Sequence, residues 1–253
     1  MSKKYRSTHI TGKLTVHHYL LSSSSIKHYL PHTIPFSKAN LERMISRYKM
    51  LYIKPNAGSQ GIGIYQLVRD NKRYTLKSTS KINKSFASLQ QLYDYIKPRL
   101  RKKYIIQQGI YLEKVNGNTY DLRTMIQRKP KKAWAVTGTF AKIARPNMIV
   151  NNYYQGSRVA MMNQLFDRLN LDAAQSNARM AQIHKVSHKI AEQLSKKKSG
   201  LYELGIDYAY DHHGHLWVLE VNSRHPQIYL LKKIAPDMYN RMLKYAKSIG
   251  RSS

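Results

Sequence analysis

With 253 residues, 42% of them hydrophobic, the chain is long enough for one large domain or two small ones with a real core. It contains no cysteine, no apolar run long enough to span a membrane, and no apolar segment of signal-peptide length at its N-terminus. We therefore expect an intracellular protein without disulfides, without a cysteine-based zinc site and without a membrane span.

The charge is strongly unbalanced, since lysine and arginine outnumber aspartate and glutamate by 44 to 13 and the formal net charge is +31. Basic residues cluster at 97–103, 128–132 and 195–198. Such a surface attracts polyanions, including nucleic acid, acidic polymers and carboxylate-rich proteins. The chain has no zinc-finger, RNA-recognition or helix-turn-helix pattern. A solvated surface without a particular partner, or an acidic substrate, therefore fits better than a dedicated nucleic-acid site.

Residues 1–37 are polar and weakly periodic, and two prolines near the end of this segment favour an extended connector. A helix is predicted over 37–49, with Ser37 as its N-cap. Leu41 and Met44 mark its apolar face.

The stretch 51–68 is typical of a strand, a glycine-rich turn and a second strand. Lys54 closes the first strand, and 58–63 contains three glycines. Glycines let backbone N–H groups approach an anion closely, and a lysine beside them adds a mobile charge suited to phosphate. A P-loop would place the lysine after the glycines and open a helix, so that motif is excluded. A hairpin with a flexible loop fits this stretch equally well.

Further along, the pattern predicts a strand over 73–77, an amphipathic helix over 85–101 that Pro98 ends or kinks, and a strand over 104–108. Gly109 breaks that strand.

Two long strands are predicted over 121–128 and 133–145, and the polar segment 146–157 after them suits an active-site loop or a surface loop. The longest helix is expected over 172–197, and a last helix follows Pro236.

An acidic hairpin is predicted where 203–211 and 216–223 form strands joined by the turn 212–215. If the turn pairs Asp211 with Leu216, then Asp207 lies directly across from Glu220. Strict alternation places Ile206, Tyr208 and Tyr210 on one face of the first strand and Asp207 on the other. It also places Val218, Glu220 and Asn222 on one face of the second strand.

Two facing carboxylates repel each other, so this hairpin needs a cation. Mg²⁺ prefers carboxylate and carbonyl oxygens, keeps some of its waters and bridges to phosphate. Asp207, Glu220 and Asn222 form a suitable set of oxygen donors. The alternative is that one carboxylate pairs with one of the many lysine or arginine side chains.

The ordered motifs resemble those of the YheC/YheD family, which is associated with the endospore coat, within the ATP-grasp superfamily. They are Lys54-Pro55, the glycine turn 58–63, IIQQGI (105–110), DLR (121–123), ARPN (144–147) followed by VNN (150–152), and the acidic hairpin. The resemblance covers roughly residues 30–230. It implies an α+β ATP-grasp fold in which two α+β subdomains enclose the nucleotide. The expected division is an extended N-terminal segment (1–37), a smaller subdomain (38–110) with the lysine strand and glycine flap, and a larger subdomain (111–253) with the metal-binding hairpin.

The resemblance also implies a role for individual residues. Lys54 would contact the nucleotide phosphates, the glycine turn would close over them, and the hinge between the subdomains would read adenine. Arg123 and Arg145 would bind phosphate or a developing acyl phosphate. The residues implied in nucleotide binding are Lys54, Gly58, Ser59, Gln60, Gly61, Gly63, Gln107, Gln108, Ile110 and Asn152, and those implied in Mg²⁺ binding are Asp207, Glu220 and Asn222.

By this resemblance, the protein is an ATP- and Mg²⁺-dependent carboxylate–amine ligase that acts through an acyl phosphate. Its carboxylate substrate and amine acceptor are unknown, and the positive charge favours an acidic peptide or polymer. A sporulation context would place it in the cytoplasm or on the spore coat, with spore-coat proteins as candidate partners. Nucleic acid is not an expected partner.

Two other functions fit the same sequence. A non-catalytic spore-coat protein would keep the fold and bind nucleotide without turnover, and a polyanion- or nucleic-acid-binding protein would use the basic surface. The joint presence of the site residues favours the enzyme. Only a short segment precedes the lysine strand, where many relatives carry a substrate-binding domain, and this favours the non-catalytic protein. The hinge also has Gln107-Gln108 where many relatives carry an acid.

Overall fold

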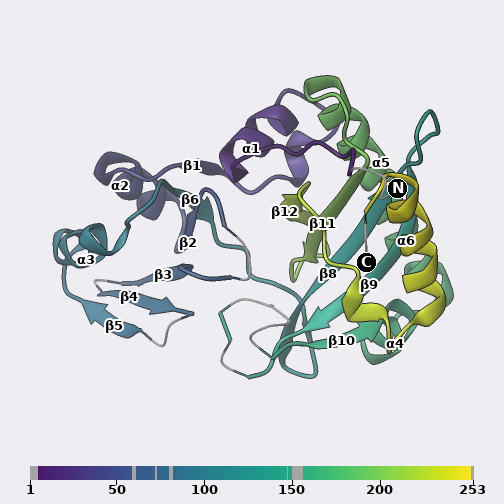
Figure 1. Cartoon of the computed structure of the whole chain (residues 1–253). Helices are drawn as coiled ribbons and strands as arrows, with labels where there is room; N and C mark the ends of the chain where they lie inside the picture. Colours follow the sequence, from purple (N-terminus) through teal and green to yellow (C-terminus); the bar gives the residue numbers. More distant parts are fainter. Residues whose placement is uncertain are drawn as a thin grey trace.

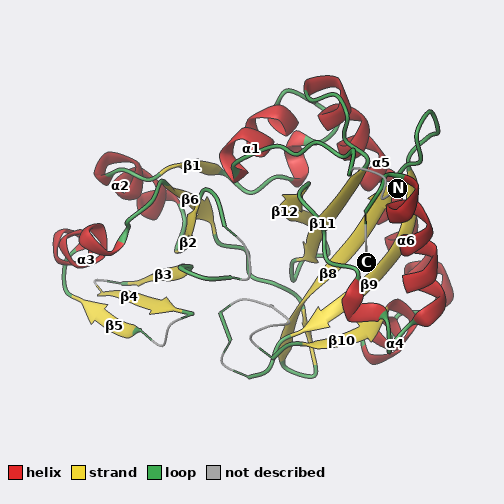
Figure 2. Ribbon diagram, viewed as in Figure 1, coloured by secondary structure: helices red, strands yellow, loops and turns green. Residues whose placement is uncertain are grey.

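The computed structural model describes residues 5–58, 61–71, 73–79, 82–146, 148–149 and 156–251. These residues form two α+β parts, each built on an antiparallel sheet, which lie side by side in Figures 1 and 2. Both ends of the chain lie on the larger part, where the Arg6 backbone N donates to the Ile249 carbonyl oxygen at 3.0 Å.

The smaller part is a six-stranded sheet in the order β1-β6-β2-β3-β4-β5, with two helices packed on it. Its core joins Leu41 and Met44 of the first helix and Leu92 and Ile96 of the second to the strands. The elements are β1 (Thr33–Pro35), α2 (Lys38–Arg47), β2 (Met50–Pro55), β3 (Tyr65–Asp70), β4 (Arg73–Ser78), β5 (Asn83–Phe86), α3 (Leu89–Ile96), the 3₁₀ turn η2 (Lys97–Arg99) and β6 (Tyr104–Gln108).

The larger part is a sheet in the order β10-β9-β8-β11-β12, with the short β7 paired to β8. α5 and α6 cover opposite faces of this sheet, because the stripe of α5 shares a core with Ile206 and Tyr208, whereas Met242 of α6 packs with Met125 and Phe140. The elements are α1 (Lys13–Leu21), η1 (Lys27–Tyr29), β7 (Lys114–Val115), β8 (Asn118–Gln127), β9 (Ala135–Ile143), β10 (Arg158–Met161), α4 (Met162–Arg168), α5 (Ala173–Lys197), β11 (Glu203–Tyr210), β12 (Leu216–Asn222), η4 (Tyr229–Leu231) and α6 (Pro236–Ser248).

Most of the predicted elements are confirmed, together with the local chemistry that predicted them. Ser37 caps α2, and its Oγ accepts a hydrogen bond from the Asn40 backbone N at 3.1 Å. The long helix α5 begins after Asp172, whose carboxylate caps it in the same way, and it buries the apolar stripe that includes Ile183 and Ile190.

The predicted helix over 85–101 is wrong at its start. Residues 83–86 form the edge strand β5 instead, where Phe86 pairs with Tyr74, and α3 begins only after Ser88. Ser88 caps that helix by accepting from the Gln91 backbone N at 3.2 Å. Strand pairing with β4 therefore overrides the helical spacing of Phe86, which the sequence pattern alone does not reveal.

The N-terminal segment differs from the extended connector expected over 1–37, because it contains α1 and η1 and ends in β1. α1 has no capping side chain of its own at Gly12. Asn56 of the smaller part supplies the caps, since its carbonyl oxygen accepts from the Lys13 N at 2.8 Å and its Oδ1 accepts from the Leu14 N at 2.9 Å. A cap that comes from a distant residue leaves no local signal in the sequence.

We predict that Asn56→Ala lowers the free energy of unfolding by about 1 kcal/mol, because α1 loses its only side-chain cap in the described residues. It should also make the N-terminal segment more accessible to limited proteolysis. Urea denaturation and trypsin digestion measure the two effects. Asn163→Ala, at an exposed position of α4, is the control. Equal stability and equal digestion of the two variants would contradict this account of α1.

Candidate functional site

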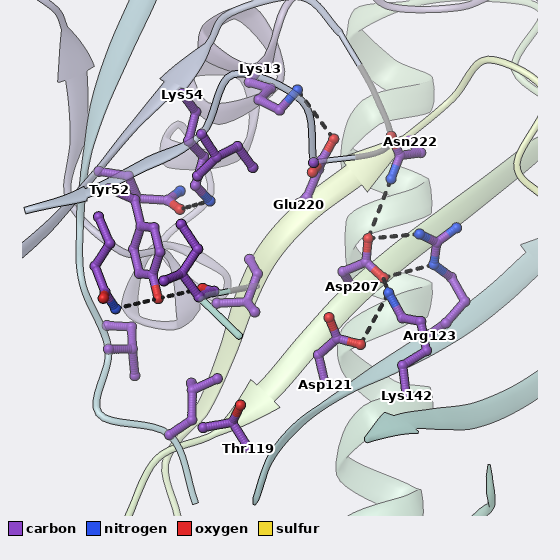
Figure 3. Close-up of a pocket in the computed structure, with 18 of the residues that line it drawn as sticks. Lys13, Tyr52, Lys54, Thr119, Asp121, Arg123, Lys142, Asp207, Glu220 and Asn222 are labelled. Atoms are coloured by element: carbon purple, nitrogen blue, oxygen red, sulfur yellow. Dashed lines mark hydrogen bonds and ion pairs between the residues drawn. The ribbon is translucent and has the colours of Figure 1, made fainter. Parts of the chain in front are cut away.

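A cavity of about 500 Å³ separates the two parts and collects most of the residues that the sequence predicts to be functional. Its walls come from β2, β3 and β6 on one side and from β8, β9, β11 and β12 on the other. Figure 3 shows the charged residues facing each other across it. The predicted residues that line it are Lys54, Gly58, Gly61, Gln107, Gln108, Ile110, Arg123, Asp207, Glu220 and Asn222.

Lys54 lies at the end of β2, and its ammonium donates a hydrogen bond to Gln107 Oε1 at 2.5 Å. Gln107 in turn donates to Thr33 Oγ1 at 3.1 Å, so the lysine is held by a fixed acceptor. Burial lowers the pKa of Lys54 to about 8, although the carboxylate of Glu220 opposes this shift. The ammonium is therefore poorly solvated, and an anion that enters the cavity would stabilise its charged form.

The glycine-rich turn adopts the backbone conformation that glycine permits. Gly58, Gly61 and Gly63 all have positive φ, at 142°, 73° and 73°. Gly58 and Gly61 line the cavity, whereas Gly63 lies against Pro55 and the Tyr104 hydroxyl. Residues 59 and 60, predicted to bind nucleotide as Ser59 and Gln60, lie outside the described residues.

The apolar end of the cavity lies beside the predicted hinge at the end of β6. Met50, Ile110 and Leu219 line it. Gln108 also lines the cavity, and its Oε1 accepts from the His32 backbone N at 3.2 Å. A flat apolar ligand would fit between these side chains, with backbone groups at its edge.

The acidic hairpin has the predicted register at the site, because Asp207 pairs directly with Glu220. The predicted pairing of Asp211 with Leu216 is wrong, since Leu216 pairs with Tyr210. A β-bulge between Asp207 and Tyr208 shifts the register by one residue and reconciles the two.

The bulge also corrects the predicted face of Val218. Leu219 is the extra residue opposite Asp207 and Tyr208. Val218 therefore points into the core together with Val221, while Leu219 and Glu220 both line the cavity. Strict alternation, which placed Val218 beside Glu220 and Asn222, cannot detect a bulge.

A network of four charged side chains forms the floor of the cavity (Figure 3). Arg123 binds Asp207 through two hydrogen bonds, Nε to Oδ1 at 2.7 Å and Nη2 to Oδ2 at 2.8 Å. Lys142 Nζ lies 3.1 Å from Asp207 Oδ1 and 3.0 Å from Asp121 Oδ1. Asp121 with Lys142, and Arg123 with Asp207, are directly opposed cross-strand pairs.

The network sets the pKa values of its two carboxyl groups in opposite directions. Burial alone would raise the pKa of Asp207, but the charges of Arg123 and Lys142 hold it below its usual range. Burial raises the pKa of Asp121 to about 7, and Lys142 opposes this shift. Asp207 thus stays ionised, while Asp121 changes its charge near neutral pH.

Glu220 has its own cation, since Lys13 Nζ lies 3.3 Å from its Oε1. Lys13 also donates to the carbonyl oxygen of Gly58 at 2.9 Å. The N-terminal segment therefore bridges the glycine turn and the acidic hairpin across the cavity, as Figure 3 shows for Lys13 and Glu220.

The sequence pattern did not assign Lys13, Lys142 or Asp121 a role in the site. Lys142 carries a usable signal, because it is the single charge of the apolar strand β9, and Asp121 belongs to the DLR motif. Lys13 carries none, because it is one of 44 basic residues in a polar segment.

Among the described residues, two predicted ones do not line this cavity: Gly63, as described above, and Arg145, which lines a second cavity beside β10 and α4. Asn152 lies outside the described residues. Arg145 as a phosphate ligand and Asn152 as part of the nucleotide site stay predictions.

Comparison with known proteins identifies the architecture. A family model described as YheC/D-like ATP-grasp matches residues 3–249. The chain belongs to the YheC/D-like ATP-grasp family. The endospore coat-associated protein YheD of Bacillus subtilis (strain 168) is 26% identical over 96% of this chain and 55% of its own length. The related protein YheC of the same organism is 22% identical over 95% of this chain and 68% of its own length. The chain thus spans about half the length of YheD.

Solved ATP-grasp structures confirm the fold. N5-carboxyaminoimidazole synthetase from Staphylococcus aureus, complexed with ADP, superimposes with a TM-score of 0.57 at 11% identity, over 96% of this chain and 52% of the other. D-alanyl-alanine synthetase A from Vibrio cholerae gives 0.57 at 11% identity, over 95% and 64%. The C-terminal domain of K. lactis Pby1 gives 0.54 at 16% identity, over 91% and 68%. The α+β ATP-grasp fold expected from the sequence is therefore confirmed, whereas the exact subdomain boundaries stay predictions.

The described part of the ATP-grasp chain has no helix long and apolar enough to cross a membrane. It also has no group of three or more histidine, aspartate or glutamate side chains that would hold a metal ion. The predicted Mg²⁺ ligands comprise two carboxylates and one amide. Asp207 already pairs with two cations, which is the alternative that the sequence left open for one carboxylate.

The donor set nevertheless has the chemistry that Mg²⁺ requires. Glu220 and Asn222 line the cavity, and Asn222 Nδ2 lies 3.4 Å from Asp207 Oδ2. The carbonyl oxygen of Asn222 and the carboxylate of Glu220 are hard donors, and Mg²⁺ completes its shell with water and phosphate. Lys13 is the competing cation at Glu220.

We predict that Lys142→Met lowers the free energy of unfolding of this ATP-grasp protein by about 3–5 kcal/mol, because it leaves two buried carboxylates with one arginine between them. Adding Asp121→Asn should restore part of the loss, because the amide removes the cost of burying or protonating the Asp121 carboxylate. Lys132→Met, at an exposed turn, is the matched control. Urea denaturation measures all four proteins, and equal stability of the two lysine variants would refute the network.

The pKa of Lys54 predicts a pH dependence of stability. Between about 8 and 10.5 the unfolded chain holds a proton that the folded chain has lost, so the contribution of Lys54 to stability rises with pH in this window. Below about pH 8 both states are protonated and the cost of burying the ammonium is present in full. The free energy of unfolding of the wild type minus that of Lys54→Met should therefore increase from pH ~7.5 to ~10. A flat or falling difference would mean that the ammonium is well solvated.

Proposed function

We propose that the protein is an ATP- and Mg²⁺-dependent carboxylate–amine ligase. The observation that carries this proposal is the convergence of Lys54, the positive-φ glycines and the Asp207–Glu220 pair on one cavity, in a chain of the ATP-grasp family. The cavity is lined both by apolar side chains, such as those of Met50, Ile110 and Leu219, and by cations and carboxylates. This polarity suits a nucleotide, whose base is flat and whose phosphates are charged.

The binding of ATP follows from this polarity. Adenine would occupy the apolar end near Ile110 and Leu219, where backbone groups of the hinge reach its edge. The phosphates would lie between the N–H groups of the glycine turn and the ammonium of Lys54. Because burial has lowered the pKa of Lys54 to about 8, a phosphate beside it would restore the favourable environment of the charge.

Mg²⁺ would be held by Glu220, Asn222 and Asp207, and it would supply charge neutralisation at the phosphates. Lys13 must then leave Glu220, and its ammonium remains close enough to the glycine turn to contact phosphate instead. Arg123 keeps Asp207 ionised and aligned, so that the carboxylate can serve as a ligand or as an orienting group.

The reaction needs no side-chain nucleophile. A substrate carboxylate oxygen attacks the γ-phosphorus of ATP, the bond to the β-phosphate oxygen breaks, and ADP leaves with the electron pair. The amine then attacks the acyl carbon, the bond from that carbon to the phosphate oxygen breaks, and inorganic phosphate leaves and takes up the proton that the nitrogen loses. Lysine and arginine in the cavity offset the negative charge that develops on the transferred group.

The substrates are proposed to be acidic, because the net charge of +31 attracts polycarboxylates. The spore-coat association of the B. subtilis relatives supports a role in sporulation, in the cytoplasm or on the coat. It also supports a second candidate, a non-catalytic coat protein that binds nucleotide without turnover. A polyanion-binding protein that uses only the basic surface is the third candidate.

We predict that calorimetry will detect ATP binding that depends on Mg²⁺. Glu220→Gln should weaken it at least about ten-fold in the presence of Mg²⁺ and much less in its absence, because the lost charge acts on the metal. Lys54→Ala should weaken it under both conditions. Glu192→Gln, exposed on α5, removes the same charge and should have no effect.

The catalytic part is tested by ADP release with acidic peptides as substrates. Turnover lost in both Lys54→Ala and Glu220→Gln would support the ligase. Full activity of both variants would refute the proposed site. ATP binding without ADP release for any carboxylate would support the non-catalytic coat protein, and steeply salt-dependent polyanion binding that survives Lys54→Ala would support the third candidate.

A further inference from the structure

A second cavity, of about 710 Å³, lies where β9 ends and β10 and α4 begin. Arg145, Arg158 and Arg168 line it and come from three different segments. The amide side chains at its walls are those of Asn116, Asn118 and Gln164, and no acidic residue lines it. We call this cavity the arginine groove.

The three arginines lack the partners that the other cavity and core cations have. Arg123, Arg179 and Arg251 each form an ion pair with a carboxylate. All 13 acidic residues of the chain lie in its described part, and none of the ion pairs there includes an arginine of the groove. Three like charges around one hollow repel one another, so an anion that enters it is attracted by all three.

The arginine groove is a neighbour of the nucleotide cavity. Asn118 lines the groove and Thr119 lines the nucleotide cavity, as expected for successive residues of a strand. On the facing segment, Arg145 lines the groove, whereas Met148 and Ile149 line the nucleotide cavity. The two hollows therefore adjoin each other along β8 and the segment that follows β9.

The lining favours a polypeptide over a nucleic acid. Guanidinium groups bind carboxylates through two parallel hydrogen bonds, and side-chain amides can pair with backbone N–H and C=O groups. Small apolar side chains such as Val159 and Ala160 fill the rest of the wall. Among the described residues, no aromatic side chain on which a base could stack lines the groove.

We propose that the arginine groove binds an acidic peptide segment and holds the substrate of the ligase beside the nucleotide cavity. The proposal rests on the proposed function for its role in catalysis, but the binding itself needs no ATP. Arg158 and Arg168 are the docking residues, and Arg145 lines the same groove on the segment that leads to Met148 and Ile149 of the nucleotide cavity.

The test is binding of a short fluorescent peptide of alternating aspartate and glycine to the full chain, measured by anisotropy. Arg158→Gln/Arg168→Gln should weaken binding about ten-fold or more, because two charge-assisted contacts are lost. Arg101→Gln/Arg241→Gln removes the same charge from exposed positions outside the groove and should weaken it less than about two-fold, by the general field alone. Thermal melting of both variants checks that they fold.

Equal weakening by the two double variants would overturn the proposal, because the whole positive surface would then bind the peptide. Tighter binding of polyphosphate or single-stranded DNA, lost in the groove variant, would also overturn it in favour of a phosphate site. ATP titration separates the two proposals. If ATP fails to bind while the peptide binds in the groove, the ligase proposal is refuted and the peptide-binding proposal is retained. If ATP binds and the peptide does not, only the peptide-binding proposal is refuted.

Discussion

Four buried and mutually opposed charges determine the polarity of the cavity floor. They belong to Asp121, Arg123, Lys142 and Asp207. They come from three adjacent strands, β8, β9 and β11, and each charge lies directly across from its opposite. Buried ion pairs of this kind contribute little net stability, because desolvation offsets most of the attraction. Their effect is positional: they hold two carboxylates and two cations at fixed places on the floor of a cavity that would otherwise be lined by an ordinary apolar sheet.

The bulge at Leu219 also shapes the cavity, because it lets one hairpin contribute side chains both to the hydrophobic core and to the cavity wall. On one side of the bulge, Val218 and Tyr208 complete the core beneath α5. On the other, Glu220 stays opposite Asp207 while Leu219 adds an apolar side chain to the cavity wall. A regular hairpin would offer one of these arrangements only. The irregularity therefore lies at the site where the hydrophobic core and the polar cavity meet.

The sequence predicts those features that depend on neighbours in the chain. The cap at Ser37 and the register of Asp207 against Glu220 are of this kind, as is the glycine-rich turn after Lys54. It fails where a distant residue decides the outcome: Asn56 caps α1, pairing with β4 turns 83–86 into a strand, and Lys13 reaches Glu220 across the cavity. Arg145 shows a third case, because its motif is recognisable but the direction of its side chain depends on how β9 leads into the following segment.

The bridge that Lys13 makes between Gly58 and Glu220 has a consequence for the way the cavity opens. The ammonium group of Lys13 links the two parts of the chain, because it contacts the Gly58 carbonyl oxygen on one side and Glu220 on the other. An anionic ligand or a metal ion that binds there would replace the contacts of Lys13 with contacts of its own. A ligand that displaces Lys13 from Glu220 removes these contacts, so its apparent affinity is reduced by their free energy. The N-terminal segment, which the sequence pattern predicts to be an extended connector, is thereby coupled to the cavity through Lys13.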